Sequence, residues 1–126
     1  MKGRKVLIAE DEPHILRIMS MWLSRQGYTV FEARHGGEAL DLLRREAMDV
    51  LISDMNMPGV DGLTLIRAVR EELKLDLPVF FLTARCDQDR LAQQLRPYHV
   101  RLYPKPFVPS RLVAEIDGTL QGAIRG

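Results

Sequence analysis

The chain has 126 residues, which suits one domain and leaves little room for a second. Hydrophobic residues make up 46% and charged residues 28%, and the net charge of +1 gives no general attraction to nucleic acid or to an anionic membrane. The single cysteine excludes an internal disulfide, no apolar run approaches the roughly 18 residues of a membrane span, and no secretory leader is recognisable, so the cytoplasm is the expected location.

Strand-like apolar runs alternate with helical patterns along the whole chain. Strands are predicted at residues 5–9, 28–33, 49–53, 78–84 and 100–103. Helices are predicted at residues 13–26, 36–47, 62–73, 87–95 and 109–124. Pro13 is compatible with the first turn of a helix, and Gly27 is a suitable residue just after its end. We therefore expect residues 1–126 to form a single domain of five strand–helix units.

This alternation predicts an α/β fold with a doubly wound, mostly parallel five-stranded sheet and five helices. The strand segments "VLIA", "VLIS" and "VFFL" are continuously apolar, as strands buried on both faces require. One common strand order for such a sheet is 2-1-3-4-5, and its ligand site lies at the carboxyl ends of strands 1 and 3.

Three acids fall at that expected site. Glu10 and Asp11 follow the first predicted strand, and Asp54 follows the third. A single acid at a strand end is usually just solvated, but three converging carboxylates repel one another unless a cation is bound. Mg²⁺ prefers a few carboxylates together with water and substrate oxygens, so this edge is a candidate magnesium site.

Two further polar residues belong to the same edge of the sheet. Thr83 lies near the end of the fourth predicted strand, and Lys105 follows the fifth. Taken singly, Thr83 is an ordinary strand residue and Lys105 an ordinary surface residue. Together with the acids they form a set suited to phosphoryl transfer, which depends on positioning and charge neutralisation.

The motifs "VLIAEDE", "DVLISDMNMPGVDG", "FLTA" and "PKPF" resemble those of the receiver domain of two-component response regulators. The resemblance covers nearly the whole chain in order and spacing, and it implies a flavodoxin-like fold. It further implies that Asp54 accepts a phosphoryl group, in a Mg²⁺-dependent reaction, from a phosphohistidine on a sensor histidine kinase or a histidine phosphotransfer protein. Asp54 is then expected to be exposed at its strand end, where a partner's imidazole reaches it.

The same resemblance implies roles for the other residues. Asp11 would bind Mg²⁺ directly, Glu10 mainly through water, and Asn56 through its backbone carbonyl. Met57-Pro58-Gly59 would fix the loop that carries this carbonyl. Thr83 and Lys105 would bind phosphoryl oxygens, and the Lys105–Pro106 peptide bond would be cis. Phosphorylation would then switch the binding of a downstream protein target or effector domain.

The chain departs from the family pattern in its fifth strand. Leu102 occupies the position where Tyr or Phe commonly acts as a switch residue. Tyr103 cannot simply replace it, because adjacent strand residues face opposite sides of a sheet. Tyr98-His99 replaces the usual Gly-Ala before this strand. We therefore expect activation to move the fifth strand less than the loop after Thr83 and the fourth helix.

Other functions are compatible with parts of this pattern. A haloacid-dehalogenase-type phosphatase would need a second Asp two residues after the nucleophile, and that position is Asn56. A pseudo-receiver, acting as an interaction module without phosphate, stays the alternative to a phosphorylated switch. The expected activities are self-phosphorylation and autodephosphorylation rather than those of a turnover enzyme. The length further leads us to expect a stand-alone receiver or one excised from a longer regulator.

Overall fold

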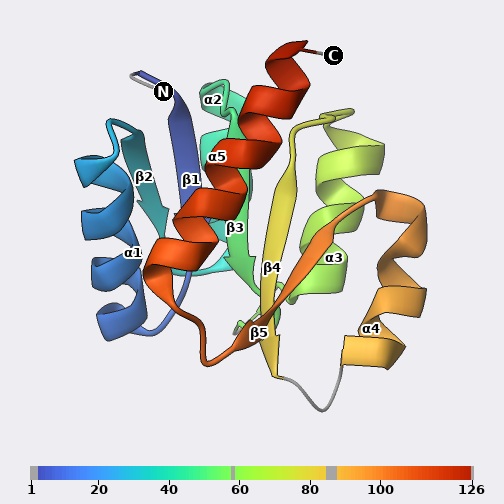
Figure 1. The fold of residues 1–126 in the computed structure, drawn as a ribbon. Helices are drawn as coiled ribbons and strands as arrows, with labels where there is room; N and C mark the ends of the chain where they lie inside the picture. The colour runs from blue at the N-terminus through green and yellow to red at the C-terminus, as the bar shows by residue number, and fades with distance from the viewer. Residues whose placement is uncertain (1–2, 58, 85–87, 126) are drawn as a thin grey trace.

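The computed structural model describes residues 3–57, 59–84 and 88–125, which form a parallel sheet covered by helices (Figure 1). The strands are β1 (Lys5–Ala9), β2 (Thr29–Ala33), β3 (Val50–Asp54), β4 (Val79–Ala84) and β5 (Arg101–Lys105). Their order is β2-β1-β3-β4-β5 and every pair is parallel, which confirms the predicted topology.

The helices lie on both faces of this sheet. They are α1 (Pro13–Arg25), α2 (Gly36–Arg45), α3 (Gly62–Arg67), α4 (Gln88–Leu95) and α5 (Pro109–Arg125). Two short turns, η1 (Ala68–Glu72) and η3 (Arg96–Tyr98), follow α3 and α4. Side chains of α1 and α5 pack on one face, and those of α2, α3 and α4 pack on the other.

The strands explain why their sequences are continuously apolar. In β1, Val6 and Ile8 enter the core beneath α1 and α5, whereas Leu7 and Ala9 enter the core on the opposite face. All four side chains are fully buried. Because successive strand residues point to opposite faces, burial of both faces requires an apolar residue at every position.

Local hydrogen bonds set the ends of the helices. Asp61 accepts a hydrogen bond from the Thr64 backbone N–H at 2.9 Å and so caps α3. His35 Nδ1 accepts one from the Glu38 N–H at 3.2 Å and caps α2. Gly27, with φ of 94°, adopts the left-handed conformation that commonly ends a helix, here α1.

Two elements differ from the prediction. The fifth strand, predicted at residues 100–103, runs from Arg101 to Lys105 and therefore includes Pro104. Because β5 is an edge strand, a proline that lacks an N–H is tolerated there.

The helix predicted at residues 62–73 is α-helical only to Arg67 and continues as the π-helical turn η1, in which both Ala68 and Val69 stay buried. The other boundaries agree to within one or two residues, the usual uncertainty of helix and strand ends.

No helix within the described part of the chain is both long enough and apolar enough to cross a membrane. Pro58 and Cys86 lie outside the described residues.

Candidate functional site

The carboxyl ends of β1 and β3 bring three acids together. Glu10 and Asp11 directly follow β1, and Asp54 is the last residue of β3. The two strands pair in parallel with Ala9 opposite Ser53, so the segments that follow them leave the sheet side by side. One carboxylate oxygen from each acid lies within 4.8 Å of the others. The structure therefore places the three predicted acids in one cluster at the topological switch point.

The burial of this cluster corrects one expectation. The sequence predicts an exposed Asp54, but its side chain has only 8% of its surface accessible. Glu10 is buried to 1% accessibility, while Asp11 is exposed. Asp54 is shielded because it belongs to a central strand and because the ammonium of Lys105 lies against it.

Among the described residues, Lys105 is the cationic residue that contacts these acids. Its Nζ lies 2.9 Å from Asp54 Oδ1 and 3.7 Å from Glu10 Oε1. Burial of the lysine lowers its pKa, but the close contact with Asp54 and the charges of Glu10 and Asp11 outweigh burial, so the net pKa is raised. Lys105 is therefore held in its charged form.

Glu10 is the least well satisfied of the three acids. Its Oε2 accepts a hydrogen bond from the Glu12 N–H at 3.1 Å, but its buried Oε1 has no hydrogen-bond partner within the described residues. Burial raises the pKa of Glu10 to about 7, with the charges of Asp54 and Asp11 acting in the same direction and the Glu12 N–H and Lys105 partly opposing them. The nearest cationic group to this Oε1 among the described residues is the Lys105 ammonium, at 3.7 Å.

This donor set fits a small divalent cation. When all three carboxylates are ionised, Lys105 is their one cationic partner among the described residues and balances one of the three negative charges. Carboxylate oxygens are the ligands that Mg²⁺ prefers, and an oxygen without a hydrogen-bond donor is available to a metal or to its water. The residues present are therefore compatible with the cation that the sequence predicts.

Thr83 and Asn56 lie at the same edge of the sheet. Thr83 is in β4, 1% accessible, and its hydroxyl makes only a long contact of 3.4 Å with the Ala84 carbonyl oxygen. Asn56 is exposed immediately after β3, between the buried side chains of Met55 and Met57.

The loop after β3 is held by packing that the sequence did not reveal. The Gly62 N–H donates to the Met55 carbonyl at 2.9 Å, and a Cβ at Gly62 would lie 2.5 Å from Met55 Sδ. Gly59 has φ of +81°, which favours glycine. The expected contribution of Pro58 falls outside the described residues. The alternation of Met55 and Met57 around Asn56 was the available clue that this loop is anchored by its flanking side chains.

The position of Leu102 agrees with the predicted pattern of β5. Leu102 packs with the core beneath α2, α3 and α4, whereas Tyr103 packs with the core beneath α1 and α5. The two side chains thus point to opposite faces of the sheet, as predicted for adjacent strand residues.

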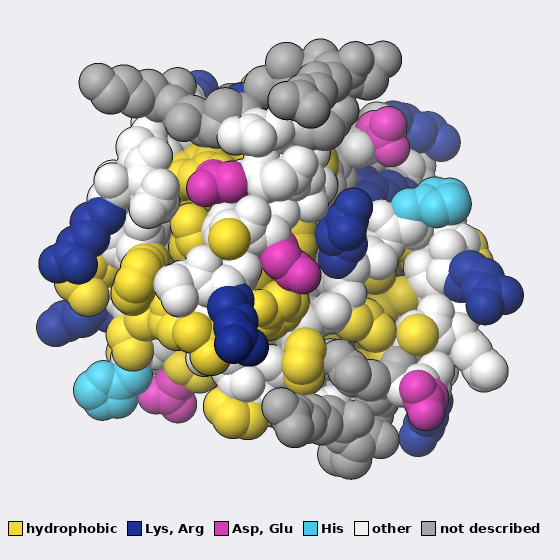
Figure 2. Space-filling model, in the orientation of Figure 1, with side chains coloured by type: hydrophobic (Ala, Val, Ile, Leu, Met, Phe, Trp, Pro, Cys, Tyr) yellow, Lys and Arg dark blue, Asp and Glu magenta, His cyan; other side chains and the backbone are white. Residues whose placement is uncertain are grey.

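An apolar pocket beside the acids was not predicted. Its volume is about 510 Å³, and it has one charged lining residue, Lys105. The lining residues are Ile15, Ile18, Ala84, Lys105, Pro106, Phe107 and Pro109. Hydrophobic side chains gather at the lower left of the face in Figure 2, over α1 and the start of α5. The Lys105–Pro106 bond in this wall is cis, as the resemblance implied.

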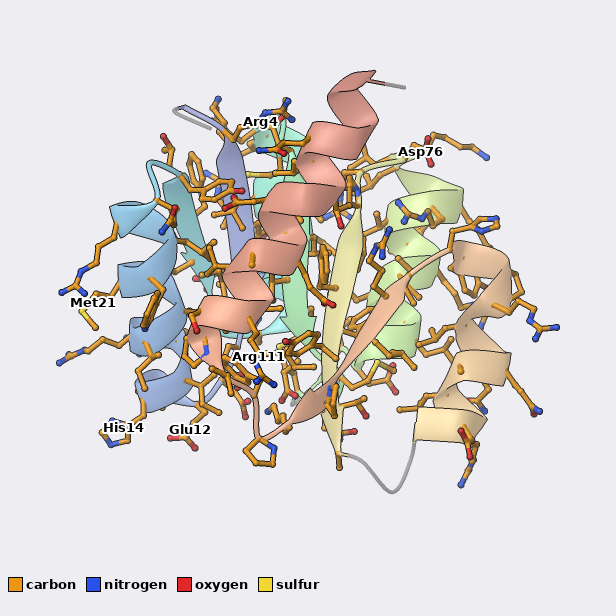
Figure 3. All side chains as sticks on the ribbon, in the orientation of Figure 1. Arg4, Glu12, His14, Met21, Asp76 and Arg111 are labelled. Carbon is orange, nitrogen blue, oxygen red and sulfur yellow. The ribbon has the colours of Figure 1, made fainter. Side chains whose placement is uncertain are left out.

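The two ends of the sheet carry different sets of charged residues. Figure 3 shows Glu12 and His14 at the lower end, where the carboxyl ends of the strands lie, and Arg4 and Asp76 at the opposite end. Arg4 there forms an ion pair with Asp49 at 3.9 Å. Within the described residues, the acid cluster, the lysine and the apolar pocket all belong to the lower end.

The fold and this edge define a flavodoxin-like α/β domain with an acidic site at its switch point. The model of the response regulator receiver domain family matches residues 6–117. The chain is 36% identical to the response regulator GtcR of Aneurinibacillus migulanus over 96% of its own length and 49% of the relative. It is 32% identical to the transcriptional regulatory protein ResD of Bacillus subtilis, over 94% of its length and 49% of that protein.

Solved structures agree with this relationship. The chemotaxis response regulator CheY4 of Vibrio cholerae superposes with a TM-score of 0.84 at 30% identity, covering 92% of this chain and 98% of that one. The chain therefore belongs to the receiver domain family of two-component response regulators, which are signalling domains. It spans about half the length of the curated relatives that it matches.

Proposed function

We propose that this domain receives a phosphoryl group on Asp54 and thereby switches its interaction with a downstream protein target or effector domain. The observation that carries the proposal is the cluster of Glu10, Asp11 and Asp54 with Lys105 in contact with two of these acids. Such a cluster supplies an oxygen nucleophile and a fixed positive charge in one partly enclosed place, which is what phosphoryl transfer requires.

In the proposed step, a carboxylate oxygen of Asp54 attacks the phosphorus of a phosphohistidine. A new P–O bond forms, the P–N bond breaks, and the imidazole leaves with the electron pair of that bond and takes up a proton. The Lys105 ammonium, 2.9 Å from Asp54 Oδ1, moves onto a phosphoryl oxygen as the charge shifts away from the carboxylate. Among the described residues, the buried hydroxyl of Thr83 makes one long contact of 3.4 Å, and we expect it to donate to a second phosphoryl oxygen instead.

Mg²⁺ would be held by Glu10 and Asp11, together with Asp54 and the Asn56 carbonyl. When bound, it neutralises negative charge on the phosphoryl oxygens and on the acids. Glu10 would contribute mainly through a metal-bound water at its Oε1, which accepts no hydrogen bond within the described residues.

The partner in this proposal is a sensor histidine kinase or a histidine phosphotransfer protein. A protein that delivers phosphohistidine to Asp54 would approach close to the apolar pocket, because Lys105 belongs to both the pocket and the acid cluster. Ile18 on α1 and Val108 before α5, two large apolar side chains near this pocket, are 40% and 49% accessible and add apolar surface to such a contact.

The proposed chemistry includes self-phosphorylation by small phosphodonors and slow autodephosphorylation, without turnover of an external substrate. We infer that residues 1–126 act as one receiver domain. The single cysteine leaves no internal disulfide and agrees with the cytoplasm as the place of this reaction.

Intact mass measurement tests the proposal. The wild-type protein is incubated with acetyl phosphate and Mg²⁺, and we expect a fraction of the molecules to gain the mass of one phosphoryl group. Asp54→Asn should gain none, and Asp11→Ala or an excess of EDTA should reduce the gain at least tenfold.

Asp41→Asn is the matched control, because Asp41 is an exposed carboxylate on α2 outside the site. It should be phosphorylated like the wild type. Absence of any mass gain in the wild type, with acetyl phosphate and with a phosphorylated histidine phosphotransfer protein alike, would favour the pseudo-receiver instead.

A further inference from the structure

Arg70, in the π-helical turn η1, binds backbone carbonyls from two separate connecting segments. Its Nη1 donates to the carbonyl oxygens of Leu75 and Leu77 at 3.0 and 2.8 Å, in the segment that leads into β4. Its Nε donates to the Tyr98 carbonyl at 2.9 Å, and its Nη2 makes a longer contact of 3.5 Å with the His99 carbonyl. One guanidinium thus joins the end of the α3–η1 helix to the segment before β5.

Both connected segments contain a residue in the left-handed conformation. Lys74 has φ of 56° and His99 has φ of 54°, and neither is glycine. Side chains other than glycine adopt this region at a cost, so the surrounding contacts must hold them there. Arg70 binds the carbonyl of His99 itself and those of Leu75 and Tyr98, which are the chain neighbours of the two left-handed residues.

A second hydrogen bond strengthens the same connection. The Tyr98 hydroxyl donates to Glu71 Oε2 at 3.0 Å, so adjacent residues of η1 bind the backbone and the side chain of Tyr98. Among the described residues, no carboxylate forms an ion pair with Arg70, so its donors are directed at backbone carbonyls. Burial lowers the pKa of Arg70, and the charge of Asp76 partly opposes this.

The segment held in this way leads directly into the altered part of β5. Tyr98, Val100 and Leu102 all pack against the core beneath α2, α3 and α4. Arg96, His99, Val100 and Leu102 also line a groove of about 430 Å³ beside α4. The conformation of η3 and the start of β5 therefore sets one wall of this groove.

We propose that Arg70 is a clamp that fastens η3 and the start of β5 to the end of α3, so that this segment keeps its conformation when the site is phosphorylated. That Arg70 fastens the segment is a property of the unmodified domain. That the segment keeps its conformation on phosphorylation rests on the proposed function. The domain would then change near Asp54, Thr83 and α4 and present residues 96–102 to its target in a preformed state.

Hydrogen exchange of the unmodified protein tests the clamp without phosphate. The amides of Leu75 and His99, bonded to Val69 and Arg96 carbonyls, report on the two left-handed turns. In Arg70→Met their exchange should rise at least tenfold over the wild type. Arg67→Met, which replaces an exposed arginine on α3, should leave it unchanged. Equal exchange in Arg70→Met and the wild type would overturn the clamp.

Tyr98→Phe provides a second test in case Arg70→Met does not fold. It removes only the hydrogen bond from the Tyr98 hydroxyl to Glu71. It should raise exchange at His99 by a smaller factor and leave Leu75 unchanged. No change at His99 in a folded Tyr98→Phe protein, together with an Arg70→Met protein that does not fold, would also count against the clamp.

Amide shifts with Mg²⁺ and a beryllofluoride phosphoryl mimic test whether the segment keeps its conformation. In the wild type we expect large shifts at residues 54–57 and at Thr83 but several-fold smaller ones at 96–102, and Arg70→Met should enlarge the latter. Wild-type shifts at 96–102 as large as those at the site would refute a fixed segment. Absence of shifts at residues 54–57 would instead refute the proposed function, and the exchange result would still decide the clamp.

Discussion

Glu10 is a residue whose burial conflicts with its charge. It is 1% accessible, and burial raises its pKa from 4.5 to about 7. Because the folded-state pKa lies above the unfolded value, the folded protein binds the extra proton between these two values. In the absence of a cation, the contribution of Glu10 to stability is therefore fully present below about pH 4.5 and is lost as the pH rises through about 7.

Replacing Glu10 by glutamine removes this titration. At pH 8 in EDTA we expect Glu10→Gln to be more stable than the wild type by roughly 1–3 kcal/mol, and the difference should shrink toward pH 5. Urea unfolding over this pH range measures the effect. Glu12→Gln removes an exposed carboxylate two residues along the chain and should leave the pH dependence of the unfolding free energy unchanged. Parallel pH profiles for Glu10→Gln and the wild type would show that Glu10 does not cause the dependence.

At the scale of the elements, α1 presents different side chains to the core, to the pocket and to solvent. Leu16, Met19 and Leu23 are buried against the sheet, Ile15 and Ile18 line the apolar pocket, and Met21 is 44% accessible outside it. Figure 3 shows Met21 pointing away from the sheet. The helix therefore combines a structural face with an apolar edge beside the acid cluster.

A charge on this edge should hinder a protein donor but not a small one. We expect Ile18→Asp to slow phosphotransfer from a phosphorylated histidine phosphotransfer protein about tenfold, because a buried carboxylate in an interface lacks a partner. Phosphorylation by acetyl phosphate should stay within about twofold of the wild type. Met21→Asp places the same charge on the same helix outside the pocket and should change neither rate. An equal loss with both donors would mean that Ile18→Asp disturbs the site itself.

At the scale of the whole molecule, the fold relies on close contact between segments far apart in the sequence. Gly36, at the start of α2, lies against the backbone of Val60, where a Cβ would be 2.8 Å from the carbonyl oxygen and 2.5 Å from Val60 Cβ. This contact joins α2 to the loop between β3 and α3, the same loop that carries Asn56. By contrast, a Cβ added at Gly118 on α5 would meet nothing within 4 Å.

The two glycines therefore predict opposite effects of the same substitution. Gly36→Ala should destabilise the protein by about 1–3 kcal/mol, because the backbone must move to admit the methyl group. Gly118→Ala should stabilise it by roughly 0.5–1 kcal/mol, because alanine is the better helix former at an exposed position. Urea unfolding at pH 7 measures both, and a stabilising Gly36→Ala would contradict the close packing described for α2.

The sequence by itself determined the alternation of strands and helices and the positions of the acids at two strand ends. The order 2-1-3-4-5 is one common order for such a sheet. Short continuous apolar runs and the helical period of 3.6 are local properties of the chain, and parallel strands bring their carboxyl ends to one edge whatever the detailed packing. The alternation of apolar segments predicted the α/β class, and the common strand order together with the positions of Glu10, Asp11 and Asp54 predicted the cluster.

Only the tertiary structure decided the burial of Asp54, the length of β5, the π-helical turn and the contacts of Arg70. Each depends on residues distant in sequence: Lys105 covers Asp54, and the Tyr98 carbonyl receives the Arg70 guanidinium from a different segment. A side chain's accessibility and hydrogen-bond partners arise from contacts that no local pattern encodes. The residue types at the site were thus readable from the chain, whereas their environment follows from how the whole domain packs.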